Sequence, residues 1–381
     1  MKRIGILLAV CLLLTMLPVT AGAVDMQIKG KSALLMDIAT GTVLYEQNAH
    51  ERLAPASVTK VMTMLLIMEA IDSGKIGWND TVIASETAAA KGGSQIYLKM
   101  GESMSVTDMV KSIAVSSAND CACAMAEHIA GSEAAFVDMM NNRAAELGMN
   151  DTHFVNCTGL DDDPAAKEHL TSAYDIAVMS RELMKNHPDI QKFTTIWMDT
   201  VRNGEFGLSN TNKLVRFYPG ATGLKTGFTS SAGYCLSATA QRNGLALVAV
   251  VMGCETSQDR FGACKQLLDY GFANFALVKP ELEELSVPVK LGTADAVRAV
   301  PAEAAQLLVD KAQANQVQVR TELEEQVSAP VSKGQRLGTL TVKVGEQTVT
   351  QIPMVAAEAV PRLTWWDIFR MVLGKFAMAK A

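Results

Sequence analysis

Residues 55–70, PASVTKVMTMLLIMEA, place the strongest constraint on the fold, because they form a strongly apolar helix pattern that contains one lysine, Lys60. A lone lysine on such a helix can extend its charged end to water along the helix surface. Ser57, however, lies one turn earlier, and the i, i+3 spacing places its hydroxyl and the Lys60 amine on one helix face. The rest of the chain decides between a solvated lysine and a buried amine that acts on the hydroxyl.

The length and charge of the chain limit its architecture and its partners. At 381 residues it is too long for one ordinary domain and suits a large core plus a smaller unit. Its formal net charge is −6, and it has no stripe of Lys and Arg with interleaved aromatic residues, which argues against nucleic acid as a partner. No internal repeat of about 20–50 residues occurs.

The first residues, 1–23, have the pattern of a secretory signal peptide. Lys2 and Arg3 form a basic start, residues 4–17 an apolar run, and residues 21–23 (AGA) a cleavage site of small residues. The alternative is a transmembrane anchor, for which the apolar run is short. We therefore expect a secreted protein that works outside the cytoplasm.

The seven cysteines and five histidines do not form a recognisable framework. Cys121 and Cys123 lie in an alanine-rich helix pattern, and the other cysteines of the mature chain are scattered singly, so we expect most of them to be small core residues. No two histidines have metal-ligand spacing. We expect no metal ion and no organic cofactor.

Strand patterns open and close the first large region, and helix patterns fill the sequence between them. Residues 32–48 predict two strands around a turn at 39–41, and residues 233–254 predict a hairpin around Asn243-Gly244. Helices are predicted over residues 57–72, 105–131 with an interruption near 116–119, 132–147, 172–186 and 260–275. We expect an α/β or α+β domain of three layers at residues 24–277.

Beyond Pro280 the helical periods give way to short alternating runs such as LSVPVKL and LGTLTVKVG. This pattern predicts a small antiparallel β domain at residues 281–353, with the role of a spacer or stalk.

The tail, residues 362–381, is basic in an otherwise acidic chain. On a helical wheel its apolar residues share one broad face: Trp365, Ile368, Phe369, Val372, Leu373 and Phe376. Tryptophans on an apolar face with a basic rim suit a helix that lies in the plane of a membrane surface. The alternative is a helix packed back on its own domain.

A serine hydroxyl attacks a carbonyl only when a base removes its proton. No GxSxG turn surrounds any serine here, and a lysine can replace the usual histidine when burial among apolar side chains lowers its pKa. Ser57 and Lys60 are followed by residues 117–119 (SAN) and 225–227 (KTG), the order of motifs in penicillin-binding proteins and class A β-lactamases. The structural alternatives are a loop turn closed by a hydroxyl and a lysine on an edge strand.

This sequence resembles the low-molecular-mass penicillin-binding proteins, the serine-type D-Ala-D-Ala carboxypeptidases of peptidase family S11. The likeness covers most of the mature chain and is carried by ALLMDIATGTVLYEQNAHERLAPASVTKVMT, GLDDDPAAKEHLTSAYDIA, NTNKLVRFYPGATGLKTGFTSSAGYCLSATA and the tail helix. It implies an α/β domain of the β-lactamase/transpeptidase type, with the site between an all-helical lobe and a five-stranded sheet.

The resemblance also implies the catalytic roles of four residues. Ser57 is expected to be the acylated nucleophile and Lys60 its general base. Ser117 is expected to relay a proton to the leaving D-alanine. Asn119 is expected to hold the substrate amide or to orient Lys60.

The KTG motif is expected to bind substrate. Lys225 and Thr226 would bind the terminal carboxylate, and Gly227 would keep the strand clear for the peptide. The oxyanion hole would consist of backbone N–H groups from Ser57 and Phe228. Arg260 is expected to be a plain surface arginine, with a further carboxylate contact as the alternative.

The activity implied is removal of the terminal D-alanine from peptidoglycan pentapeptides, covalently inhibited by penicillin, in peptidoglycan maturation and cell shape. The implied partners are the stem peptide, β-lactams and the outer face of the cytoplasmic membrane, to which the protein would be peripherally attached. A β-lactamase or endopeptidase on the same scaffold and a wall-binding protein without activity are the alternatives; an intact serine, lysine and SxN set argues against the last. The exact stem peptide and the oligomeric state stay open.

Overall fold

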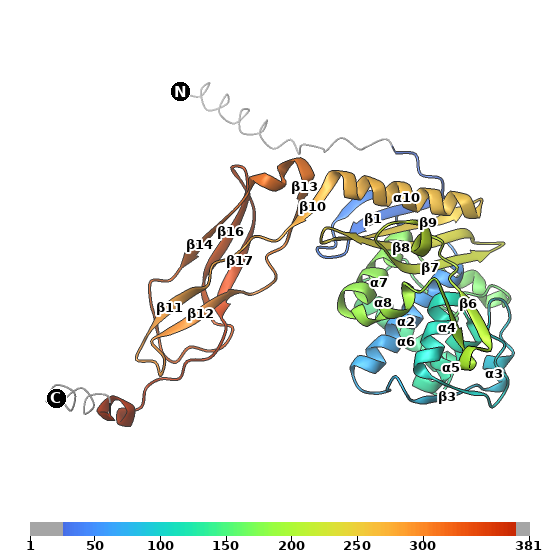
Figure 1. Cartoon of the computed structure of the whole chain (residues 1–381), viewed down its shortest axis with the longest axis horizontal. Coiled ribbons are helices and arrows are strands. Elements are labelled where there is room, and N and C mark those ends of the chain that lie inside the picture. The colour runs from blue at the N-terminus through green and yellow to red at the C-terminus, as the bar shows by residue number, and fades with distance from the viewer. Residues whose placement is uncertain (1–25, 371–381) are drawn as a thin grey trace, which may run out of the picture.

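The computed structural model describes residues 26–370, and Figure 1 shows a large domain joined to an elongated β domain. The large domain contains a five-stranded sheet in the order β2-β1-β9-β8-β7, with every neighbouring pair antiparallel. Its strands are β1 (Ser32–Asp37), β2 (Val43–Gln47), β7 (Ala221–Thr229), β8 (Gly233–Arg242) and β9 (Leu245–Cys254). Strand β7 therefore forms one edge of the sheet.

The predicted hairpin joins β8 to β9. Asn243 has a φ of 50° and Gly244 a φ of 82°, the left-handed values that a two-residue turn between twisted strands requires. Helix α10 (Ser257–Asn274) covers one face of the sheet, and the helical lobe covers the other (Figure 1). The expected three-layer domain is confirmed.

The lobe is built around α2, whose residues from Lys60 to Met68 are all buried. A helix that is apolar on all sides finds its place only where other helices enclose it. The helices of the lobe are α2 (Lys60–Asp72), α3 (Glu86–Ala89), α4 (Val106–Ser116), α5 (Asn119–Ala130), α6 (Glu133–Glu146), α7 (Ala173–Asn186), α8 (Gln191–Thr194) and α9 (Leu214–Phe217).

Serine side chains fix where four of these helices begin. The hydroxyl groups of Ser85, Ser105, Ser132 and Ser172 each accept a hydrogen bond from the backbone N–H three residues on, at the starts of α3, α4, α6 and α7. The predicted interruption near residues 116–119 is also present, because α4 ends at Ser116 and α5 begins at Asn119.

Short elements complete the large domain. Its two-stranded sheets pair β3 (Thr81–Ile83) with β4 (Ser103–Ser105), and β5 (Met198–Val201) with β6 (Phe206–Ser209). Its 3-10 segments are η1 (Ala56–Thr59), η2 (Pro164–Glu168), η3 (Pro188–Ile190) and η4 (Arg202–Gly204). The six cysteines within residues 26–370 are buried and unpaired, as expected of small core residues.

The smaller domain has its own apolar core around Val287, Leu340 and Ile352. Its six-stranded sheet has the order β14-β16-β17-β12-β11-β15, in which β11 and β15 pair in parallel and the other pairs are antiparallel. The strands and the 3-10 segment are β11 (Leu285–Lys290), β12 (Ala296–Pro301), η5 (Lys311–Gln316), β14 (Val317–Leu323), β15 (Val327–Ser328), β16 (Arg336–Val344) and β17 (Gln347–Ala356). A separate pair, β10 (Phe275–Val278) with β13 (Leu307–Asp310), lies where the two domains join.

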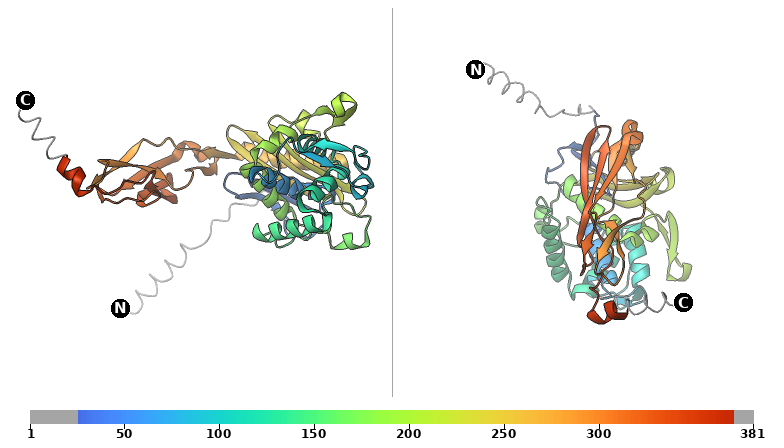
Figure 2. Two further views of the ribbon diagram at one scale, coloured as in Figure 1. Left: turned by 90° about the horizontal axis from the view of Figure 1, so that it is seen from below. Right: turned by 90° about the vertical axis from the view of Figure 1, so that its left-hand side faces the viewer.

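The tail begins at the end of the smaller domain that lies farther from the large domain, as Figure 1 and the left view of Figure 2 show. Of the predicted tail helix, 362–381, residues 365–370 are helical and residues 362–364 are not, while 371–381 and the predicted signal peptide, 1–23, lie outside the described residues. Within residues 26–370, no helix has both the length and the apolar character that crossing a membrane requires.

Candidate active site

Ser57 lies in η1, the single 3-10 turn that leads into α2. Strand β7 passes so close to this turn that a Cβ atom on Gly227 would lie 2.5 Å from the Pro55 carbonyl oxygen and 3.1 Å from the Val58 nitrogen. Only glycine allows this approach. The SxxK and KTG motifs are far apart in the sequence, but the Ser57 turn and the edge strand β7 therefore lie against each other.

Lys60 is fully buried, and its Nζ atom donates two hydrogen bonds. One runs 2.9 Å to the Ser57 Oγ atom and the other 2.8 Å to the Thr158 carbonyl oxygen. Burial lowers the pKa of Lys60 to about 7, and the nearby Cys157 and Asp120 oppose that effect only in part. The alternative of a lysine that extends its charged end to water is excluded, because Lys60 has no exposed surface.

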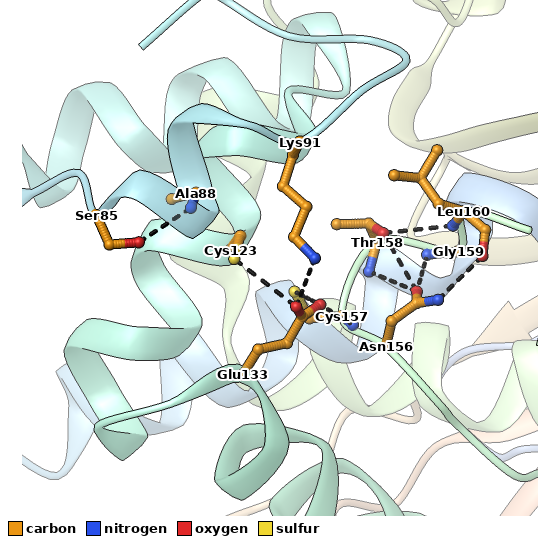
Figure 3. A network of polar contacts seen from close by, with 10 residues as sticks. All are labelled: Ser85, Ala88, Lys91, Cys123, Glu133, Asn156, Cys157, Thr158, Gly159 and Leu160. Atoms are coloured by element: carbon orange, nitrogen blue, oxygen red, sulfur yellow. Dashed lines mark hydrogen bonds and ion pairs between the residues drawn. The ribbon is translucent and has the colours of Figure 1, made fainter. Parts of the chain in front are cut away.

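Residues 156–160 form a tight turn (Figure 3), and the Thr158 carbonyl in this turn accepts the second hydrogen bond from Lys60. The Asn156 Oδ1 atom accepts hydrogen bonds from the backbone N–H groups of Thr158 and Gly159, at 3.1 and 2.7 Å. The turn is also tied to the lobe, because the Glu133 carboxylate accepts from the Cys157 N–H at 3.3 Å and pairs with Lys91 at 2.6 Å. Sequence reasoning missed this turn, since a backbone carbonyl leaves no mark in the sequence.

Ser117 and Asn119 lie at the junction of α4 and α5. Ser117 has a left-handed φ of 62°, and both side chains are buried. The Asn119 Nδ2 atom donates to the Gly92 carbonyl at 2.7 Å. The Ser117 Oγ and Asn119 Oδ1 atoms have no hydrogen-bond partner among the described residues, which leaves both able to bind a polar group of a ligand.

Asp120 is a second group that sequence reasoning missed. Its buried carboxylate accepts backbone hydrogen bonds from Ile96 at 3.1 Å, from Leu98 at 3.0 Å and from Cys121 at 2.9 Å. Asp120 thereby holds residues 96–98 in place, in the same loop whose Gly92 carbonyl accepts the hydrogen bond from Asn119. The sequence signal that could have identified Asp120 is its position as an acidic residue directly after the SxN motif.

Lys225 and Thr226 lie on β7, and both are buried. The Lys225 Nζ atom donates to the Thr226 carbonyl at 2.9 Å, and the Thr226 hydroxyl donates to Thr211 Oγ1 at 2.7 Å. Burial holds the pKa of Lys225 well below its usual range, and the positive charges of Lys60 and Arg260 act in the same direction. Three basic side chains, Lys60, Lys225 and Arg260, therefore lie close enough to disfavour one another's charge, and a bound carboxylate would favour the charged form of Lys225.

Arg260 is not the surface arginine expected from the sequence. It is 8% exposed, and its guanidinium donates to the Gly227 carbonyl at 2.9 Å. The rings of Tyr234 and Phe261 enclose it at 5.2 and 4.9 Å. Its position on α10, which packs on the sheet, explains the burial, and no pattern in the surrounding sequence indicated it.

Phe228 follows the KTG motif with its side chain 52% exposed. Its ring lies over Tyr234, with centroids 4.3 Å apart. The side chain of Phe228 has no polar group, so only its backbone could hydrogen-bond a ligand.

A possible metal-ligand cluster occurs elsewhere in the described residues, where atoms of Glu69, Glu182 and His187 lie within 4.8 Å of one another. The Arg143 guanidinium already pairs with Glu69 and with Glu182, each at 2.8 Å. A cation in the same place would meet this positive charge, so the cluster is an ion-pair network.

Comparisons with known proteins show which family the chain is similar to. Residues 19–256 match the family model "D-alanyl-D-alanine carboxypeptidase", and residues 272–362 match "Penicillin-binding protein 5, C-terminal domain". The chain is 42% identical to D-alanyl-D-alanine carboxypeptidase DacF of Bacillus subtilis, over 92% of this chain and 91% of the relative.

Two solved structures extend the likeness to the fold. Penicillin-binding protein 5 of Haemophilus influenzae superposes with a TM-score of 0.75 at 30% identity, covering 90% of this chain and 100% of its own. Penicillin-binding protein D2 of Listeria monocytogenes in its ampicillin-bound form gives a TM-score of 0.60 at 32% identity, covering 65% of this chain and 99% of its own.

Proposed function

The chain belongs to the D-alanyl-D-alanine carboxypeptidase family, and we propose that it removes the terminal D-alanine of peptidoglycan pentapeptides through an acyl-enzyme on Ser57. The observation that carries the proposal is the 2.9 Å hydrogen bond from Lys60 Nζ to Ser57 Oγ, made by a fully buried amine. A lysine whose pKa is about 7 is a competent base at neutral pH. This is the serine-type mechanism.

In the first half of the reaction, neutral Lys60 takes the hydroxyl proton while Ser57 Oγ attacks the carbonyl of the penultimate D-alanine. The backbone N–H groups of Ser57 and Phe228 stabilise the negative charge that develops on the carbonyl oxygen. The C–N bond then breaks, and the proton reaches the leaving amine by way of Ser117. In the second half, water attacks the ester and restores Ser57.

The terminal carboxylate of the substrate binds at the KTG strand. Because β7 is an edge strand, an extended peptide can pair with it through main-chain hydrogen bonds. Lys225 and the Thr226 hydroxyl supply the charge and the donor, and Arg260 adds its positive charge from behind the Gly227 carbonyl. Asn119 holds the substrate amide on the opposite side.

Penicillin follows the same acylation path, and we propose that its adduct is long-lived. A class A β-lactamase adds a glutamate that activates water for hydrolysis of the adduct. Here Glu133 is engaged by Lys91, and Glu182 by Arg143, so neither is free for that step. The alternative of a β-lactamase is therefore less favoured.

The test is release of D-alanine from a soluble pentapeptide ending in D-Ala-D-Ala, together with the lifetime of the penicillin adduct. We expect continuous release of D-alanine and an adduct that persists for minutes. Rapid turnover of penicillin without release of D-alanine would instead identify a β-lactamase.

We also propose that the protein is secreted and attached to the outer face of the cytoplasmic membrane, where it acts in peptidoglycan maturation and cell shape. The basis for secretion is the sequence of residues 1–23. The basis for attachment is the exposure of Trp365 and Trp366, at 67% and 62%, at the far end of the smaller domain. Amphipathic tryptophan side chains favour the membrane interface.

A further inference from the structure

The residue before the nucleophile has an unusual backbone conformation. Ala56 has a φ of 48°, in the left-handed region that residues with a Cβ atom rarely adopt. Such a conformation persists only where neighbouring groups hold it. Because Ala56 directly precedes Ser57, whatever holds Ala56 also sets the direction of the Ser57 side chain and N–H group.

A chain of two side-chain hydrogen bonds ends on the Ala56 carbonyl. The Thr59 Oγ1 atom lies 2.8 Å from that oxygen and 2.8 Å from the His169 Nε2 atom. The Val155 N–H donates to His169 Nδ1 at 3.0 Å. Nδ1 is therefore the acceptor of the neutral ring, and the ring proton is on Nε2. The order is fixed: His169 donates to Thr59, and Thr59 donates to Ala56.

The surroundings keep this chain in one state. Burial lowers the pKa of His169 to about 4, with a smaller contribution from His153, so the ring is neutral at pH 7. Gly159 packs against the same group, because a Cβ atom on it would lie 1.8 Å from the Ala56 carbonyl oxygen and 2.7 Å from the Thr59 Oγ1 atom. Only a glycine at this position leaves room for the carbonyl and the Thr59 hydroxyl together.

We propose that His169 and Thr59 are positioning residues, which hold the left-handed Ala56 so that Ser57 Oγ faces Lys60 and the Ser57 N–H faces the reacting carbonyl. This role rests on the proposed function, because it acts through Ser57. The two consecutive hydrogen bonds polarise each other, so loss of the Thr59 or the His169 side chain disturbs the same group, the Ala56 carbonyl. Neither Thr59 nor His169 hydrogen-bonds the KTG strand, and the series ends on the turn before the nucleophile, so we expect its loss to slow the acylation step rather than to impair recognition of the carboxylate.

The experiment measures acylation by a fluorescent penicillin and separates the binding constant from the acylation rate constant. Thr59→Val keeps the shape of the side chain and removes the hydroxyl. We expect it to lower the acylation rate constant about 10- to 100-fold, the scale of a small misplacement of a reacting group, with the binding constant unchanged. Thr59→Ser restores the hydroxyl and is expected to restore the rate.

A second pair of variants tests the imidazole. The amide of His169→Gln offers one acceptor and one donor, as the neutral ring does, whereas His169→Leu offers neither. We expect the glutamine variant to acylate faster than the leucine variant. The double variant Thr59→Val/His169→Leu should be no slower than Thr59→Val alone, because both changes break one chain.

Thr107→Val is the matched control, since it also removes a threonine hydroxyl that donates to a backbone carbonyl, that of Trp78 at 2.9 Å, but at the start of α4. It is expected to lower the melting temperature without a selective loss in the acylation rate constant. If Thr59→Val and His169→Leu fold and acylate at the rate of the unchanged protein, the positioning role is wrong. Failure of the proposed function would look different, because the unchanged protein would then form no adduct on Ser57.

Discussion

The Lys60 Nζ atom lies 2.9 Å from the Ser57 Oγ atom, and the hydrogen bond between them joins a fully buried amine to a half-buried serine. The same amine donates to the Thr158 carbonyl at 2.8 Å, so its position is fixed from two sides. An amine held in this way beside a hydroxyl can act as a base only when it is neutral. Its pKa therefore governs the reaction.

The rate of penicillin acylation should follow the deprotonation of Lys60. Because burial lowers the pKa of Lys60 to about 7, the neutral fraction rises as the pH rises through that value. We expect the second-order acylation rate to increase about tenfold per pH unit below pH 7 and to level off above it. The measurement is the rate of adduct formation across this range. A flat profile would contradict the assignment of the base.

Lys60→Arg is the control for this profile, because guanidinium keeps the charge but does not deprotonate. We expect acylation to fall by at least about a hundredfold, the lower range for loss of a general base, and the rise near pH 7 to disappear.

Gly227→Ala should disable the site without touching a titratable group. The new Cβ atom would lie 2.5 Å from the Pro55 carbonyl and 3.2 Å from the Ala56 Cβ atom, so either β7 or the Ser57 turn must move. We expect acylation to fall by about a hundredfold. Gly262→Ala, on α10 with no atom within 4 Å of the new Cβ, is the matched control and should leave the rate unchanged. Normal acylation by the Gly227 variant would show that the close approach is not required.

Asp120→Asn should loosen the loop beside Asn119. The carboxylate accepts backbone hydrogen bonds from Ile96, Leu98 and Cys121, and an amide in its place would turn an N–H group toward one of these donors. We expect the free energy of unfolding in urea to fall by about 1–3 kcal/mol, the cost of an unsatisfied buried group. The same change at the exposed Asp138 on α6 should have little effect. Equal losses in the free energy of unfolding at positions 120 and 138 would contradict the proposed role of Asp120 in holding this loop.

Truncation after Pro361 should abolish binding to vesicles of anionic lipid while leaving penicillin acylation intact. The truncation removes the exposed Trp365 and Trp366 together with Arg362 and the basic remainder of the tail, and so both the apolar area and the charge that favour the interface. Co-sedimentation of the two forms with vesicles measures this. If the full-length mature protein also stays in solution, the tail is not an anchor.

Much of the site could be predicted from the sequence, because its chemistry lies in side chains with a fixed order and spacing. The i, i+3 spacing of Ser57 and Lys60 is enough to place hydroxyl and amine together once a helix is assumed. The Asn243-Gly244 turn defines the hairpin in the same local way, since few other residues accept two left-handed positions.

The groups that the sequence did not indicate act through tertiary contacts or through the backbone. The Thr158 carbonyl reaches Lys60 from 98 residues away and has no side-chain signature. Arg260 lies in an amphipathic helix pattern where an exposed arginine would look the same. The left-handed Ala56 is imposed by Thr59 and Gly159, and alanine itself favours no such conformation.

The most direct test of the account is to label the mature protein with a fluorescent penicillin, digest it and locate the adduct by mass spectrometry. We expect a single adduct on Ser57 and no labelling of Ser57→Ala. An adduct on Ser116 or Ser117, or labelling that survives in Ser57→Ala, would contradict it.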